Sequence, residues 1–549
     1  MGKKKSRSSS TTPSSSTSSS RTLILLLTTA VVALLIALFL VPKSNPSPPP
    51  TTTPSLTEVT VTSREVEQGY ADAAAKQAGE LLAQRGESAL RLEDLAWMEM
   101  EEIAVGSGGV MGKKDVDALM ARRVPGVIRG AGLGSGWTQG VMETWTPETV
   151  AAQAGVLTNV LANSTRGKRF FYVDNLKPML EDVDEVSWIQ PYQVLEEVNA
   201  SDFLSLHAHK REEDIPHGHQ MYMSRKVREL SSDLRDQLNP FSDILPDDAK
   251  PVVVWLSSPG VTAHLHHDNS DNLFVQVYGS KRFLIVDPVA WDDLYMFSSL
   301  HPATRQSQVD IEALDPSAFP NVFRSLPLAG METPEGYTPR GYMVTLHPGD
   351  MLWLPAYWLH HPSAIGFSVS VMSFVSPHHK EIVKTATYGE PLPLNVEPKS
   401  KQLLTLWLWL SLVIDGVETK AGIDVTGQLS LNRVVASGSS YISSLVGSRW
   451  SHLKDDAMLL NAQVLFPPQD KVSPKYCLGN SRSDLLIHGG PHTALLQHAT
   501  RVAEQFNRLE AGVRDIALAS YVEALANHFV GTRDVAPFFT QCFLRPMER

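Results

Sequence analysis

Two short blocks of the sequence combine histidine and aspartate at a spacing that could hold a metal ion. His266 and Asp268 lie two residues apart in the block HLHHD. In a β-strand such residues project from the same face, with about 7 Å between their Cα atoms. A second block, WLHHP, supplies His360 just after an expected strand. Two imidazoles and one carboxylate on one face of a metal, with other positions open, form the usual non-haem Fe(II) arrangement.

Neighbouring histidines offer alternatives to this ligand set. His264 shares the face of His266 and Asp268 in an unbroken strand, so a shifted ligand set stays open. His267 and His361 should point to the opposite side of extended segments, and we expect them to support the ligands from outside the coordination sphere or to have structural roles. The His-rich segment 207–219 could hold a second metal, but its mixed charges favour a solvated loop.

The segments around these blocks predict a β-rich domain. From about Val124 the chain shows short apolar runs separated by Gly and Pro, among them VVVWLSS, NLFVQVYGSKRFLIVDP and GFSVSVMSFVSP. Such runs without a helix between each pair favour a sandwich or barrel over a parallel α/β sheet. We expect this mainly β core to occupy residues 122–380.

Helices are predicted on both sides of the β core. Residues 63–121 and 381–549 carry apolar residues three and four positions apart, which indicates helical N-terminal and C-terminal regions. The apolar segment 402–414 is too short to span a membrane, so we interpret it as a buried helix or an interface helix. The C-terminal helices could also pair two copies of the chain into a homodimer.

The N-terminal segment predicts a membrane anchor. Residues 1–21 form a basic, Ser/Thr-rich tail, and residues 22–41 contain an uncharged apolar run long enough to cross a bilayer. Residues 42–62 form a Pro/Ser/Thr stalk. Because the Lys and Arg residues precede the transmembrane signal anchor, we expect a single-pass type II membrane protein with its globular part in the ER or Golgi lumen. The alternative is cleavage, which would give a secreted or organellar protein.

Composition narrows the partners and the redox chemistry. The 549 residues carry a formal net charge of −11, which gives no overall basic field, so we do not expect nucleic acid as a partner. Cys477 and Cys542 permit one internal disulfide. Sequons at Asn163 and Asn199 would matter only in a lumenal protein.

Five blocks, in order along the chain, resemble one enzyme family. They are VPGVIRG, VVVWLSSPGVTAHLHHD, NLFVQVYGSKRF, PGDMLWLPAYWLHH and GFSVSVMSF. They are similar to the JmjC-domain (cupin-like) Fe(II)/2-oxoglutarate-dependent oxygenases, particularly the small protein hydroxylases that include the asparaginyl hydroxylase of hypoxia-inducible factor. The resemblance implies a double-stranded β-helix, that is, a jelly-roll or cupin barrel, flanked by α-helices.

The resemblance also implies roles for single residues. His266, Asp268 and His360 correspond to the iron ligands, and Lys281 to the cation that pairs with the distal carboxylate of 2-oxoglutarate. The family usually has Ser or Thr where this chain has Ala263. Three more residues match or approach polar positions beside the cosubstrate: Asn272, Tyr222 and Thr262.

The implied activity is hydroxylation of a substrate, with a protein side chain as the expected target. Fe(II) would be the cofactor, and 2-oxoglutarate and O₂ would be consumed with release of succinate and CO₂. Demethylation of N-methyl-lysine belongs to the wider family, but the expected membrane anchor argues against histone substrates. The rival hypothesis is a non-catalytic cupin-fold protein of the secretory pathway that binds a metal or a glycan.

Overall fold

The computed structural model describes most of the chain beyond residue 55. The described residues are 56–104, 111–130, 137–154, 156–163, 169–170, 192–215, 219–226, 231–247, 249, 252–377, 379–390, 399–420, 431–453 and 491–544. The predicted basic tail, the apolar run in 22–41 and nearly all of the stalk lie outside these residues. Residues 61–549 form one compact unit, and the description below concerns that unit.

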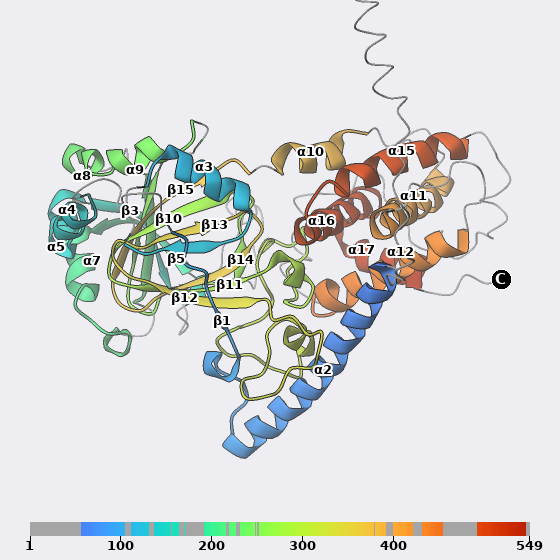
Figure 1. Ribbon diagram of the computed structural model, residues 1–549, viewed down its shortest axis with the longest axis horizontal. Helices are drawn as coiled ribbons and strands as arrows, with labels where there is room; N and C mark the ends of the chain where they lie inside the picture. Colours follow the sequence, from blue (N-terminus) through green and yellow to red (C-terminus); the bar gives the residue numbers. More distant parts are fainter. Residues whose placement is uncertain are drawn as a thin grey trace, which may run out of the picture. The chain divides into compact units, whose positions relative to one another are not determined.

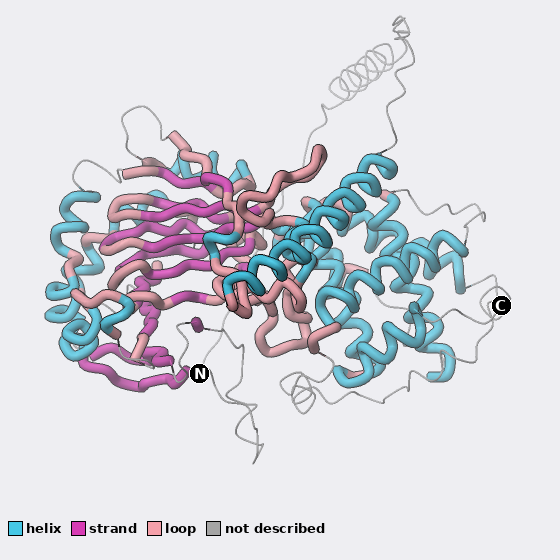
Figure 2. The backbone as a smooth tube through the Cα atoms, turned by 90° about the horizontal axis from the view of Figure 1, so that it is seen from below, coloured by secondary structure: helices cyan, strands magenta, loops and turns pink. Residues whose placement is uncertain are grey.

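Two β-sheets built mainly from antiparallel pairs form the centre of this unit (Figures 1 and 2). The first sheet has the order β1-β12-β11-β14-β8-β4, with β9 also paired to β14. Its strands are β1 (Met98–Glu99), β4 (Arg169–Phe170), β8 (Thr262–Ala263), β9 (His266–His267), β11 (Lys281–Val286), β12 (Gly341–Leu346) and β14 (Leu359–Ala364).

The second sheet has the order β2-β13-β10-β15-β7-β6-β3-β5. Its strands are β2 (Gly126–Ile128), β3 (Val156–Asn163), β5 (Tyr192–Asn199), β6 (Met221–Lys226), β7 (Val253–Ser257), β10 (Asp271–Tyr278), β13 (Met351–Leu354) and β15 (Ser368–Val375). Neighbouring strands are antiparallel, as in a jelly roll, except where β1 joins β12 and β4 joins β8.

Alternation along β10 shows why these segments are strands buried on both faces. Leu273 and Val275 pack into the cluster shared with the N-terminal helices, whereas Phe274 packs between the two sheets. Because both faces of the strand are covered, the sequence shows a continuous apolar run instead of an alternating one. The predicted β core with flanking helices is confirmed.

Short helices cover the outer face of the second sheet, and their apolar side chains share one cluster with β10 and β15. They are α3 (Lys113–Arg122), α4 (Trp137–Thr144), α5 (Pro147–Ala154), α7 (Ala200–His207), α8 (Ser232–Asp236) and α9 (Asn239–Ile244). Short 3₁₀ turns occur at Leu92–Asp94, Glu212–Asp214, Pro288–Trp291 and Pro320–Arg324.

A second helical layer packs against the loops of the first sheet and shares a core cluster with them. Its helices are α2 (Leu56–Arg85), α10 (Lys380–Tyr388), α11 (Lys399–Thr419), α12 (Leu431–Leu445), α15 (Pro491–Phe506), α16 (Ala511–Val530) and α17 (Thr532–Phe539), with π-helical turns at Val446–Trp450 and Thr540–Leu544. As predicted for segment 402–414, α11 is a buried helix: Leu406, Trp409 and Val413 are inaccessible to solvent.

The predicted membrane localisation is corrected by the structure. Among the helices that the described residues form, none is long and apolar enough to cross a bilayer. The assignment of a single-pass type II protein with a lumenal catalytic part is therefore wrong on this finding. The prediction depended on the single apolar run in residues 22–41, which lies outside the described residues.

The cysteine prediction can be followed at one of its two residues. Cys542 lies in the final π-helical turn, is buried and takes part in a disulfide. Its predicted partner, Cys477, lies outside the described residues. No free cysteine occurs in the described part of the chain.

A buried ion pair joins the C-terminal helices to the loop after β11. Glu523 in α16 is fully buried and accepts hydrogen bonds from the Ser299 amide at 2.8 Å, the Ser299 hydroxyl at 2.7 Å and the Trp450 indole at 3.0 Å. The guanidinium of Arg449 lies 3.3 Å from the same carboxylate and donates to the main-chain carbonyls of residues 296–297. This pair therefore fixes the loop against α16.

We predict that Glu523→Gln lowers the free energy of unfolding by about 3–5 kcal/mol, because it leaves the Arg449 charge buried without its counter-ion. Denaturant titration of the full chain measures this change. Adding Arg449→Met to the variant should recover part of the loss. The matched surface variant Lys384→Ala, at an exposed ion pair with Glu381, should change stability by less than about 1 kcal/mol. Equal effects at the two pairs would contradict the prediction.

Candidate metal centre

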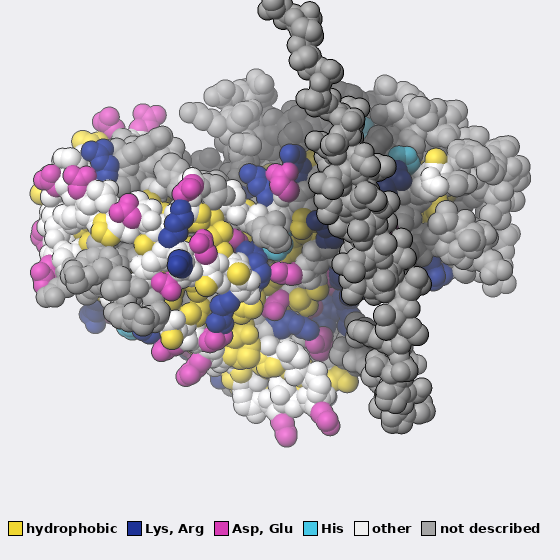
Figure 3. Space-filling view, turned by 45° about the horizontal axis from the view of Figure 1, so that its top comes forward, with side chains coloured by type: hydrophobic (Ala, Val, Ile, Leu, Met, Phe, Trp, Pro, Cys, Tyr) yellow, Lys and Arg dark blue, Asp and Glu magenta, His cyan; other side chains and the backbone are white. Residues whose placement is uncertain are grey.

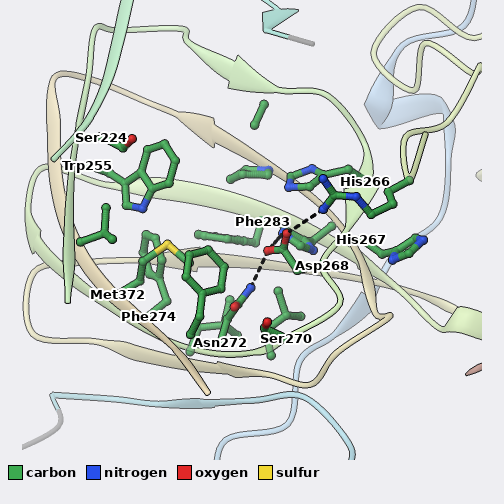
Figure 4. A pocket seen from close by; sticks show the side chains of 18 of the residues that line it. Ser224, Trp255, His266, His267, Asp268, Ser270, Asn272, Phe274, Phe283 and Met372 are labelled. Carbon is green, nitrogen blue, oxygen red and sulfur yellow. Dashed lines mark hydrogen bonds and ion pairs between the residues drawn. The ribbon is translucent and has the colours of Figure 1, made fainter. Parts of the chain in front are cut away.

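Strand pairing places the two predicted histidine ligands opposite each other. β9 pairs antiparallel with β14, and His266 is the direct cross-strand partner of His360. Their ring centroids are 4.2 Å apart. Asp268 follows β9, and its Oδ2 lies 3.7 Å from Nε2 of His360. One ligand atom from each of the three residues lies within 4.8 Å of the others, so the structure brings the predicted triad together. Figure 4 shows two of its members, His266 and Asp268, in the cavity.

Main-chain hydrogen bonds orient both imidazole rings. Nδ1 of His266 donates to the carbonyl of His264 at 2.6 Å, and Nδ1 of His360 donates to the carbonyl of Trp358 at 3.0 Å. A neutral imidazole that donates through Nδ1 has an unprotonated Nε2, which is the atom that can ligate a metal. Both rings are therefore held in the tautomer and orientation of a ligand.

Asp268 is held by two polar neighbours. Nδ2 of Asn272 donates to Oδ2 of Asp268 at 2.8 Å, and Arg305 Nη1 lies 3.7 Å from Oδ1. Asn272 was predicted to lie beside the cosubstrate. The structure places its side chain in the same cavity and gives it an additional contact with the Asp268 carboxylate.

Electrostatics put the triad in the protonation state that a divalent metal requires. Burial lowers the pKa of both His266 and His360, which keeps the imidazoles neutral. For Asp268, burial acts to raise the pKa, but His266, His360 and the Asn272 hydrogen bond together lower it. Neutral imidazoles and an ionised carboxylate are the forms that bind metal ions.

The triad opens into a cavity of about 470 Å³ between the two sheets, and Lys281 lines its wall. Lys281 is 3% exposed, and its Nζ lies 5.8 Å from the ring centroid of Tyr222 and 5.6 Å from that of Phe274. Among the described residues, no carboxylate pairs with it. Burial lowers its pKa to about 7. Tyr222 stacks on Trp255 with centroids 4.9 Å apart, and both rings line the cavity.

Three other residues from the predictions lie away from the centre. Thr262 does not line the cavity: its hydroxyl donates to Ser363 Oγ at 3.1 Å, and Ala263 occupies the lining position. The alternative ligand His264 bonds through Nε2 to the carbonyl of Ser307 at 2.6 Å. His361 is fully buried, with Nε2 3.5 Å from Glu312. The strand breaks between β8 and β9, so the simple two-residue alternation that linked His264 to His266 does not hold.

The loop 291–340 was expected to surround the site, but no pattern in it indicates which of its residues line the cavity. Thr304, Arg305 and Gln306 belong to the long loop after β11, and all three lie on the cavity wall. The amide of His267 donates to the carbonyl of Arg305 at 3.0 Å, and Arg305 adopts a left-handed φ of 69°. Loops carry no periodic pattern, so only the folded chain shows that this segment reaches the predicted metal ligands.

The donor set and the cavity fit Fe(II) with 2-oxoglutarate. Two Nε2 atoms and one carboxylate form the donor set that is typical of non-haem Fe(II) sites. A buried ammonium without an acidic partner among the described residues is costly unless an anion accompanies it, and Lys281 provides this cation in the same cavity. A dicarboxylate that binds the metal at one end and Lys281 at the other would satisfy both groups.

Comparisons with known proteins agree with the fold and the site. Residues 114–381 match the cupin-like domain family. Jumonji C domain-containing protein 5 of Drosophila melanogaster is 32% identical over 124 residues, which cover 22% of this chain and 27% of that protein. tRNA wybutosine-synthesizing protein 5 of Danio rerio is 28% identical over 159 residues, which cover 28% and 43%. The chain thus spans less than half the length of these relatives.

Among solved structures, the ribosomal oxygenase YcfD from Escherichia coli, in complex with cobalt and 2-oxoglutarate, is 15% identical to this chain. The match covers 48% of this chain and 51% of that one, with a TM-score of 0.24, which is too low to support the fold. The family match, the Jumonji C relative and the His–Asp–His triad nevertheless confirm the predicted resemblance and its cofactors, Fe(II) and 2-oxoglutarate. Residues 114–381 are thus similar to the cupin-like domain family, and this region contains the His–Asp–His triad.

Proposed function

We propose that this protein is an Fe(II)- and 2-oxoglutarate-dependent dioxygenase that hydroxylates a protein side chain. One observation carries the proposal: the ligand atoms of His266, Asp268 and His360 converge in a cavity that also contains the buried cation Lys281. When bound, Fe(II) and 2-oxoglutarate would supply the oxidising chemistry, in which 2-oxoglutarate and O₂ yield succinate, CO₂ and a hydroxylated substrate.

In this scheme the residues of the chain bind the metal, orient 2-oxoglutarate and exclude water from the cavity. His266, His360 and Asp268 would hold the metal, and the carboxylate of Asp268 would offset one of its two positive charges. Lys281 would pair with the distal carboxylate of 2-oxoglutarate. The aromatic rings of Phe274 and other apolar side chains exclude water from the cavity walls, which strengthens each of these charge interactions.

The class of substrate is the finer part of the proposal. The name of one relative connects it to tRNA, and the name of the Arabidopsis thaliana relative JMJ30 describes a lysine-specific demethylase. On the face in Figure 3, acidic and basic side chains of the described residues are interspersed. Nucleic acid binding relies on continuous basic surfaces, and the net charge is −11, so we favour a protein substrate.

Turnover tests the proposed function directly. The purified full chain with Fe(II), 2-oxoglutarate, ascorbate and O₂ should release succinate in the presence of a cell-derived peptide library. Mass spectrometry of the peptides should show additions of one oxygen atom. If wild-type protein releases no more succinate than the Asp268→Ala variant, the non-catalytic binding protein becomes the better hypothesis.

We predict that Asp268→Ala abolishes both metal binding and turnover, because it removes the anionic ligand from a buried divalent site. Titration with Mn(II), followed by electron paramagnetic resonance, should show an affinity lower by at least about 100-fold, the upper end of losses seen even for outer partners of a metal site. His264→Gln should retain Mn(II), since its ring bonds to the Ser307 carbonyl. Loss of Mn(II) in His264→Gln alone would support the shifted ligand set.

Lys281 makes the affinity for 2-oxoglutarate depend on pH. Its pKa is lowered to about 7 in the free protein, and only the ammonium form can pair with the distal carboxylate. Above pH 7 the ammonium must be re-formed on binding, so the Kd should rise with pH, by up to about tenfold per unit. Anaerobic calorimetry with Mn(II)-loaded protein between pH 6.5 and 8.5 measures this dependence.

The matched variant is Lys281→Met, which keeps the length of the side chain and removes its charge. It should bind Mn(II) normally, bind 2-oxoglutarate at least about 30-fold more weakly near pH 6.5, and lose most of the pH dependence. Retention of the wild-type pH dependence in this variant would show that another group contacts the cosubstrate.

A further inference from the structure

A second buried ion pair lies close to the metal ligands, and the proposed chemistry does not use it. Asp271 is fully buried, and its Oδ2 accepts a hydrogen bond from Nη1 of Arg123 at 2.7 Å. The Arg123 side chain is 12% exposed and comes from the C-terminal end of α3, about 150 residues earlier in the sequence. Removing two charges from water costs free energy, and apolar side chains of similar volume often stabilise a core equally well. The position of this pair therefore suggests a role in addition to packing.

Asp271 connects the two turns that carry the ligands. It begins β10, three residues after Asp268, and its Oδ1 accepts a hydrogen bond from the Ala356 amide at 2.7 Å. The Tyr357 amide donates to the main-chain carbonyl of Asp268 at 2.8 Å. The turn that contains Asp268 and the turn that precedes His360 are therefore joined twice, once through the Asp271 carboxylate.

Arg123 extends this connection to His360. Its main-chain carbonyl accepts a hydrogen bond from the Trp358 indole at 3.3 Å, and its Nη2 lies 3.3 Å from Nδ1 of His379. The carbonyl of Trp358 in turn accepts the Nδ1 hydrogen bond of His360. Hydrogen bonds thus connect Arg123 through Trp358 to the imidazole of His360. The ion pair of Arg123 with Asp271 connects it to the turn that carries Asp268.

Backbone strain concentrates around the same contacts. Arg123 has a φ of 56° and Tyr357 a φ of 70°, both in the left-handed region that residues other than glycine seldom adopt. Such conformations persist only where surrounding contacts hold them, and they are common at functional sites. Here the contacts that hold them are the ones that join the two ligand-bearing turns.

We propose that Arg123 and Asp271 are positioning residues that fix the distance and angle between Asp268 and His360 at the metal. This inference rests on the metal centre of the proposed function. Partners outside the coordination sphere that orient ligands typically contribute about 10–100-fold to metal affinity. The pair would act on coordination geometry in addition to the stability of the fold.

Cobalt(II) provides the test, because its visible absorption reports both affinity and ligand geometry without turnover. In Asp271→Asn the amide oxygen can still accept a hydrogen bond, but the amide nitrogen cannot. One of the two contacts, to the Ala356 amide or to Arg123, is therefore lost. We expect the Kd for Co(II) to rise by about 10–100-fold and the shape of the absorption band to change. Arg123→Met should have a similar effect, and Arg123→Lys, which retains the charge, should restore part of the affinity.

The matched control is Asp415→Asn in α11. Asp415 is also buried, and both of its oxygens pair with Arg433, at 2.8 and 3.1 Å, between helices α11 and α12. This variant should lower the melting temperature but leave the Kd and the Co(II) spectrum unchanged. If Asp271→Asn fails to fold, the comparison of Arg123→Met with Arg123→Lys decides.

Three results would overturn the inference, and one of them also concerns the function. Wild-type Co(II) affinity and spectrum in the folded Asp271 or Arg123 variants would reduce the pair to a structural role, with the metal centre intact. An equal loss of affinity in Asp415→Asn would assign the effect to general destabilisation. Absence of Co(II) binding by the wild-type chain would contradict the metal centre itself, and the inference with it.

Discussion

The pairing of β9 with β14 is the constraint on which the rest of the site depends. It places His266 opposite His360, and β14 also pairs with β11 so that Ile285 lies opposite His360 and Lys281 opposite Ala364. Lys281 therefore starts four residues, or about 13 Å, along the sheet from the metal ligands, on the same inner face as Ile285. A lysine side chain and a five-carbon dicarboxylate together span such a distance, so one sheet register places the residues at both ends of the proposed cosubstrate site.

Charge balance explains which polar groups this barrel can bury. Asp271 has Arg123 as a counter-ion, and Glu523 has Arg449. Lys281 is buried to the same degree, but in the described part of the chain no carboxylate pairs with it, and its pKa is lowered accordingly. The two paired sites are balanced within the protein, whereas the unbalanced charge of Lys281 favours the binding of an anion.

Much of this site could be predicted from sequence because its main determinants are local. The H-x-D spacing on a strand places His266 and Asp268 together, and the order of the blocks points to His360 and Lys281. Thr262 was predicted less well, because it is the cross-strand partner of Ser363 and its hydroxyl bonds to that side chain. The apolar run in residues 22–41 shows another limit of sequence reasoning. The hydropathy of one segment does not by itself establish a membrane anchor.

The residues that sequence could not supply reach the site through long-range contacts. Arg305 comes from a loop without periodicity, and its position beside Asp268 depends on two sets of bonds. On one side, His267 and Leu265 pair with the main chain of residues 305–307. On the other side, Gln308 donates to the main-chain carbonyl of Arg449, whose side chain also binds the carbonyls at the start of the same loop. The C-terminal helices thus hold the loop that lines the cavity. The region beyond residue 381 therefore contributes to the position of Arg305 beside Asp268.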